Sequence, residues 1–144
     1  MAQRDWVVEH MKRYRETDGA DGHIWTGRDG KQELPCLLLT TTGRRSGKPH
    51  DTALIYGQDG DSYVIVASVG GAEKHPLWYE NLAENPRVEL QVLADRFTAK
   101  ARTASGEERA KLWRRMAKIF PTYESYEEKA KASREIPVVV LERV

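Results

Sequence analysis

The chain has little cysteine, no excess of either charge and no long apolar run. Cys36 is the single cysteine among 144 residues, so no disulfide can form within the chain. Lys plus Arg number 23 against 22 Asp plus Glu, and so even a balance does not indicate a general nucleic-acid binder. No segment approaches about 18 consecutive apolar residues, so we expect no membrane-spanning segment.

Several sequence signals of function are also missing. Residues 1–19 carry charge from Arg4 onward and lack the apolar core of a signal peptide, so we expect a cytoplasmic protein. The four histidines are scattered, and no metal site is expected. Neither G-x-S-x-G, nor a P-loop, nor G-x-G-x-x-G occurs, so the hydrolase, NTPase and dinucleotide-fold interpretations lack their central element. Any catalysis is therefore expected to depend on a bound cofactor.

A length of 144 residues favours a single domain with one core. Val7, Met11 and Tyr14 recur at helical spacing, which predicts a short amphipathic helix that ends near Asp18. Residues 19–33 are rich in glycine and are expected to form a loop. Whether the helix touches a membrane surface or simply covers the rest of the protein stays open.

Strand signals dominate from residue 34 onward. Six short stretches are predicted to be strands: 34–42, 52–57, 62–68, 87–93, 97–103 and 136–141. Asp59 and Gly60 form a tight hairpin signal, and Cys36 lies in an apolar run where we expect a buried thiol. Six strands with mostly short links predict a mainly β fold, an antiparallel barrel. Closing the sheet into a barrel removes its exposed edge strands.

Two helices are expected between the strands. Pro76 opens "PLWYENLAEN" at the first helical position, and Pro86 ends it. Ser105 and Glu108 have the spacing of a capping box, and the apolar face of the helix they begin ends before Pro121.

Three stretches are candidates for a site. The tip "GRRSGKPH", residues 43–50, offers guanidinium groups and a lysine to an anion, although a cationic turn also keeps a hairpin soluble. "VASVGGAEKHPLWYENL", residues 66–82, joins a strand end to a helix through Gly70 and Gly71, which could aim amides at a ligand or merely form a turn. Tyr123 and Tyr126 share one face if helical, as a core edge or as proton donors.

Together these residues resemble a known family. "LLTTTGRRSGKP", "GGAEKHPLWYENLAENPRVELQV", "FPTYESY" and "REIPVVVLE" are similar, in this order and spacing, to the deazaflavin-dependent nitroreductases, the actinobacterial split-barrel reductases that use coenzyme F420. The resemblance covers residues 34–143 and implies a split β-barrel of six antiparallel strands. It divides the chain into an N-terminal helix and loop, 1–33, and a coenzyme-binding barrel, 34–144.

The resemblance also implies the site. Arg44, Arg45 and Ser46 occupy the family's phosphate-binding positions, residues 50–55 and 66–69 line the deazaflavin ring, residues 77–81 close over it, and Tyr123 reaches in from the substrate side. The implied cofactor-binding residues are Arg44, Arg45, Ser46, His50, Asp51, Thr52, Ala53, Leu54, Ile55, Val66, Ala67, Ser68, Val69, Leu77, Trp78, Tyr79, Glu80, Asn81 and Tyr123. The implied catalytic residues are Tyr123 and Tyr126.

The implied reaction is hydride transfer from reduced F420 to an activated alkene (an enone, unsaturated lactone or coumarin) or to a quinone, with Tyr123, Tyr126 or solvent as proton donor. His50 stands where the family often has an arginine, and Phe120 where one member has a tyrosine, so nitroimidazole reduction ranks lower. Two alternatives remain open: an oxidoreductase that uses flavin mononucleotide on the same barrel, and a non-catalytic coenzyme carrier. The expected partners are a small-molecule substrate and, at most, a second copy of the chain.

Overall fold

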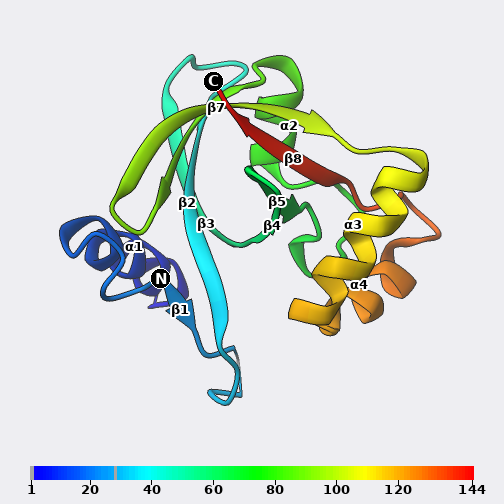
Figure 1. Cartoon of the computed structure of the whole chain (residues 1–144), viewed down its shortest axis with the longest axis horizontal. Coiled ribbons are helices and arrows are strands. Elements are labelled where there is room, and N and C mark those ends of the chain that lie inside the picture. The colour runs from blue at the N-terminus through cyan, green and yellow to red at the C-terminus, as the bar shows by residue number, and fades with distance from the viewer. Residues whose placement is uncertain (1, 28) are drawn as a thin grey trace.

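The computed structural model describes residues 2–27 and 29–144, with side chains from Val7 onward. Two residues lie outside the described part: Met1, in the predicted N-terminal region, and Arg28, in the predicted loop. The rest of the chain forms a strongly curved sheet with helices on either side (Figure 1).

The sheet has eight strands, and every ladder in it is antiparallel. The strands are β1 Ile24–Trp25, β2 Leu34–Thr42, β3 Pro49–Ile55, β4 Gly57–Asp59, β5 Ser62–Val66, β6 Arg87–Val92, β7 Asp95–Thr103 and β8 Val138–Arg143. They follow the order β1-β2-β6-β7-β8-β5-β4, with β3 paired to β2. Over the described part of the chain, β3 pairs with β2 alone, so the barrel stays split between β3 and β5. The predicted mainly β class with flanking helices is confirmed.

The count of six strands was too low. The stretch 52–57 was predicted as one strand, but β3 begins earlier, at Pro49, and the chain bends at Tyr56 before β4. Gly57 lies so close to α3 (Gly106–Ile119) that a Cβ there would stand 2.6 Å from Met116 Sδ, so a residue with a side chain would not fit without a shift of Met116. The two-residue β1 lies inside the predicted loop, and the Asp59 hairpin is confirmed by the pairing of Asp59 with Ser62.

The helices are α1 Ala2–Glu16, α2 Leu77–Glu84, α3 Gly106–Ile119 and α4 Thr122–Ala130, and Val69–Gly71 forms a short 3-10 turn, η1. The predicted end of α1 is confirmed, because Asp18 and Gly19 leave the helix with positive φ. The capping box is wrong: Ser105 makes no side-chain cap hydrogen bond, and Glu108 instead accepts two from Arg102. Pro76 caps α2 from outside rather than occupying its first turn.

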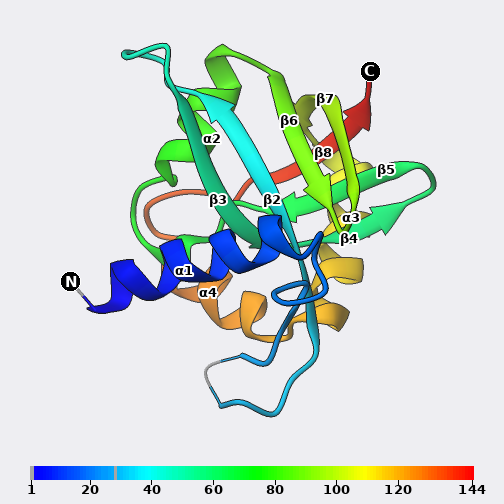
Figure 2. The same ribbon diagram turned by 90° about the vertical axis from the view of Figure 1, so that its left-hand side faces the viewer.

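Apolar side chains are buried on both faces of the sheet. In β8, Val138 and Val140 pack in the cluster under α3 and α4, whereas Val139 and Leu141 pack in the cluster inside the barrel. Because successive strand residues point to opposite faces, burial of both faces explains the uninterrupted apolar run of β8. Figure 2 shows α1 crossing in front of β2 and β3, with α4 on its far side.

Within residues 2–27 and 29–144, no helix combines the length and apolar character that crossing a membrane would need.

Candidate functional site

A groove runs along the split in the barrel, and it has two halves. One is a cavity of about 420 Å³ lined mainly by aliphatic and aromatic side chains, which we call the apolar half. The other is a cavity of about 560 Å³ whose lining includes Arg44, Arg45 and Asp51, which we call the polar half. Thr52, Val69, Pro76 and Trp78 line both, so the two cavities meet there. The groove lies where β3 has no partner on its outer side, and therefore the open seam of the sheet creates it.

The apolar half is formed by β3, by the end of β5 and by aromatic side chains from α4 and its preceding turn. Thr52 to Ile55 form one wall, and Phe120, Tyr123 and Tyr126 form another. Phe120 and Tyr123 meet edge to face, with ring centroids 5.0 Å apart, and Tyr126 lies 6.4 Å from Tyr123. Such ring packing holds each side chain in place, so this half offers a flat ligand rigid apolar walls.

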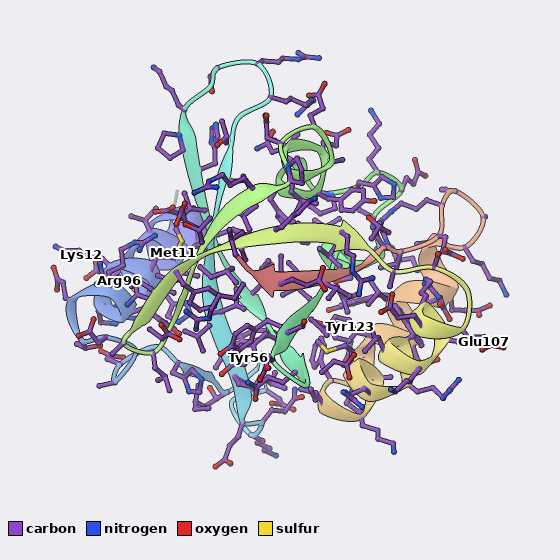
Figure 3. All side chains as sticks on the ribbon, turned by 45° about the horizontal axis from the view of Figure 1, so that its top comes forward. Met11, Lys12, Tyr56, Arg96, Glu107 and Tyr123 are labelled. Carbon is purple, nitrogen blue, oxygen red and sulfur yellow. The ribbon has the colours of Figure 1, made fainter. Side chains whose placement is uncertain are left out.

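Tyr123 is 4% exposed and points from α4 toward the sheet (Figure 3). Burial raises its pKa well above the ordinary value, so its hydroxyl stays neutral. A neutral phenol can donate a hydrogen bond or a proton to a substrate oxygen. Cys36, on β2, also lines this cavity, and burial raises the pKa of its thiol to about 12, which keeps it unreactive.

The polar half is formed by the tip of the β2–β3 hairpin and by the start of α2. The tip is tightly closed, because Gly43 N–H donates to Lys48 O at 2.8 Å and Gly47 N–H donates to Gly43 O at 2.9 Å. Arg44, Arg45 and His50 bring cationic or protonatable groups to this cavity. The sequence prediction that this tip forms a local anion site is consistent with that geometry.

Asn81 ties the tip to α2. Its side-chain oxygen accepts the backbone N–H of Arg44 at 3.2 Å, and its amide donates to Thr41 Oγ1 at 3.3 Å. Asn81 is 5% exposed, so these bonds satisfy a buried side chain and hold Arg44 over the cavity. The guanidinium of Arg44 lies 3.4 Å from the carboxylate of Glu80, the residue before Asn81 in α2.

The N-terminal helix contributes to the groove as well. Val7 and His10 line the apolar half, and His10 Nε2 donates to Gly22 O at 2.8 Å. Arg15 lies 3.0 Å from the carboxylate of Asp51, which itself lines the polar half. The ion pair therefore links α1 to the strand that carries the site.

Most of the residues predicted for the site meet in this groove. Arg44 to Ser46, residues 50–55, Val66, Ser68, Val69, Leu77, Trp78, Asn81, Tyr123 and Tyr126 line one or both halves. Ala67, Tyr79 and Glu80 line neither: Ala67 is fully buried, Tyr79 bonds Thr103 and Glu80 pairs with Arg44. Gly43 and Pro76 lie in the candidate stretches 43–50 and 66–82, whereas no sequence signal predicted the contributions of Val7, His10, Trp25 and Cys36.

The residues present fit an elongated cofactor with a flat ring at one end and an anionic group at the other. The apolar half offers aromatic walls to a ring, and the polar half offers two guanidinium groups to phosphate oxygens. Ser68 and Val69 line the apolar half, and among the described residues neither backbone N–H has a hydrogen-bond acceptor. A ring carbonyl or nitrogen would satisfy them.

Comparisons with known proteins agree with this geometry. The model of the family described as F420H(2)-dependent quinone reductase matches residues 6–143. An F420H(2)-dependent quinone reductase of Mycobacterium tuberculosis is 42% identical over 140 residues, which cover 93% of this chain and 87% of that protein.

Two solved structures are also similar. One, titled as an F420-H2 dependent reductase, FDR-A, has a TM-score of 0.69 and 38% identity, and the match covers 75% of this chain and 94% of that one. The other, described as a domain-swapped dimer, has a TM-score of 0.72 and 36% identity over 97% of this chain and 99% of that one. The predicted split-barrel fold is confirmed by these neighbours. The chain belongs to the F420H(2)-dependent quinone reductase family, and it is an oxidoreductase whose cofactor is coenzyme F420.

Proposed function

We propose that this groove binds F420 with its phosphate and acidic tail at Arg44, Arg45 and Ser46 and its ring in the apolar half, and that a quinone is reduced there. The observation that carries the proposal is the continuity of a cationic cavity with an apolar one at Thr52, Val69, Pro76 and Trp78. An anionic tail and a flat, weakly polar ring need these two surroundings at a fixed separation.

When bound in its reduced form, F420 supplies a hydride. The apolar walls exclude water and hold the acceptor against the donor, and such positioning contributes several kcal/mol to rate enhancement, up to about 7–11 in favourable cases. Hydride addition leaves negative charge on a quinone oxygen, which then needs one proton to give the hydroquinone. Tyr123 and Tyr126, both lining this half, are proposed as donors of that proton or of a hydrogen bond to that oxygen.

Activated alkenes are proposed as a second class of acceptor. Enones, unsaturated lactones and coumarins accept a hydride at the β-carbon and place the charge on a carbonyl oxygen, as a quinone does. The lining of the apolar half is mainly apolar and aromatic surface, so its walls select a flat acceptor by shape more than by hydrogen bonding. We therefore expect activity with both classes.

The oligomeric state is proposed to be a monomer or a homodimer. A structural neighbour that matches 97% of this chain is described as a domain-swapped dimer. Light scattering of the purified chain decides between the two states.

The first test is a fluorescence titration with oxidised F420, run beside flavin mononucleotide. Salt-sensitive binding of F420 alone supports the proposed site, because the tail contacts are ionic. Anaerobic oxidation of reduced F420 by menadione, followed by absorbance, then tests turnover, with coumarin as the alkene acceptor. Binding of the flavin alone would contradict the proposed site, and binding without turnover would favour a coenzyme carrier.

A further inference from the structure

The turn formed by residues 67–72, which follows β5, carries a strained residue at the centre of the groove. Val69 has φ +38°, a region that β-branched residues rarely adopt, and it lines both halves of the groove. Strain of this kind persists only where surrounding contacts enforce it, and it gathers at functional sites. The contacts that enforce it here come from outside the groove.

Arg134 supplies those contacts. Its guanidinium donates from Nε to Ala72 O at 2.8 Å, from Nη1 to Ala67 O at 3.0 Å and from Nη2 to Ser68 O at 2.8 Å. All three nitrogens of one planar cation therefore bond to carbonyls of one turn, a fork geometry that lysine cannot reproduce. Arg134 lines neither half of the groove, so any effect on a ligand passes through the backbone.

His75 and α4 restrict the positions of Arg134 and of the 67–72 turn. His75 Nδ1 lies 3.0 Å from Arg134 Nη1, and because arginine only donates, His75 must accept there as a neutral ring. Gly71 lies against α4, where a Cβ would stand 2.8 Å from Tyr126 O. The 67–72 turn therefore contacts the Arg134 guanidinium as well as α4, the helix that carries Tyr123 and Tyr126.

These bonds fix the direction of two backbone amides. The described chain has no cis peptide bonds, so the C=O and N–H of each peptide point in opposite directions. With the carbonyls of Ala67 and Ser68 turned toward Arg134, the N–H groups of Ser68 and Val69 point away from it. Both residues line the apolar half, and over residues 2–27 and 29–144 neither N–H has an acceptor.

We propose that Arg134 is a positioning residue for coenzyme binding: it holds the 67–72 turn so that the N–H groups of Ser68 and Val69 face the ring of the bound coenzyme. The inference rests on the proposed function, since it needs the ring in the apolar half. It adds Arg134, a residue outside the groove that holds part of the groove's backbone in place.

The test compares Arg134→Lys and Arg134→Ala with Arg114→Ala, which removes an exposed arginine from α3. Coenzyme affinity is measured by F420 fluorescence, folding by thermal unfolding, and steady-state kinetics with menadione separate kcat from the KM for reduced F420. We expect both Arg134 variants to raise the Kd and this KM by about tenfold or more, the size expected for charge-assisted bonds that orient two donors. Arg114→Ala should leave both values unchanged.

A rescue experiment separates positioning from general stability. Removing the side chain in Arg134→Ala leaves room for free guanidinium, which can bond the same carbonyls. We expect low concentrations of guanidinium chloride to restore F420 affinity to Arg134→Ala, whereas equal potassium chloride should not. Folded Arg134→Lys that binds F420 as tightly as the wild type would overturn the inference and leave the proposed function intact. Wild-type protein that does not bind F420 would remove the proposed site and the inference with it.

Discussion

The ion pair between Arg44 and Glu80 predicts opposite effects when its two ends are changed. The two groups lie 3.4 Å apart, with side chains 25% and 43% exposed. In the proposed binding mode, a coenzyme phosphate at Arg44 competes with the Glu80 carboxylate for the same guanidinium. We therefore expect Arg44→Ala to weaken F420 binding and Glu80→Gln to strengthen it.

The size of each effect follows from the exposure of the pair. A hydrogen bond to a charged group contributes about 1.5–3 kcal/mol, and an exposed ion pair about 0–1 kcal/mol. Losing the phosphate contact of Arg44, less the ion pair that it replaces, leaves about 0.5–3 kcal/mol, which corresponds to binding weaker by about twofold to 160-fold. Removing the competing carboxylate can gain at most the value of the ion pair, or about fivefold.

Fluorescence titration with oxidised F420, at low and at high ionic strength, measures both variants. Both effects should shrink at high salt, because the groups are partly exposed. Glu84→Gln, an exposed carboxylate at the end of the same helix, controls for the loss of one negative charge from α2. If Glu80→Gln weakens binding as much as Arg44→Ala does, the competition model is wrong and Glu80 supports the site directly.

Three further predictions follow from buried groups. Tyr123→Phe should lower kcat with quinones and leave F420 affinity unchanged, and because burial raises the pKa of this hydroxyl, pH profiles should show no tyrosine ionisation below about pH 10. Cys36, whose pKa burial raises to about 12, should resist a thiol reagent in the native protein and react once urea unfolds it. Burial and Arg134 lower the pKa of His75, so as the pH falls the unfolded chain binds a proton at His75 before the folded protein does. The contribution of neutral His75 to the free energy of unfolding should therefore be fully present above about pH 6.5 and decrease below it. His75→Gln should flatten this pH dependence in urea unfolding.

The cationic residues of the polar half could be predicted because they are neighbours in the sequence. Arg44, Arg45 and Ser46 lie in one hairpin tip between two apolar runs, so the local pattern places them together without knowledge of the rest of the fold. The same holds for the start of α2, where Pro76 marks the helix and brings Trp78 to the groove. Short-range signals sufficed for both.

The apolar half depends on segments that meet only in the folded chain. Val7 and His10 reach it because α1 crosses β3, and that crossing is fixed by distant contacts such as Tyr14 Oη to Cys36 O at 2.9 Å. Trp25 lies in a stretch with no periodicity, so no local signal marked it.

The capping box between Ser105 and Glu108 failed for a similar reason. Arg102, on the preceding strand, takes the Glu108 carboxylate with bonds of 2.6 and 2.9 Å, and it also bonds Glu142 on β8 at 3.1 Å. A planar guanidinium that meets a carboxylate with two bonds is a stronger partner than a backbone N–H. A partner from another strand therefore outcompeted the local pattern.

In the proposed binding mode, the two halves of the groove hold the coenzyme by different forces. Contacts of its tail with Arg44 and Arg45 would be ionic and partly exposed, so salt would weaken them, whereas packing against Phe120 and Tyr123 would be apolar and insensitive to salt. Coenzyme capture should therefore weaken with ionic strength while the arrangement of ring and acceptor, once formed, does not. Val69 lies where the two halves meet, so in the proposed binding mode the bonds from Arg134 that hold its turn act between the tail and the ring of the coenzyme.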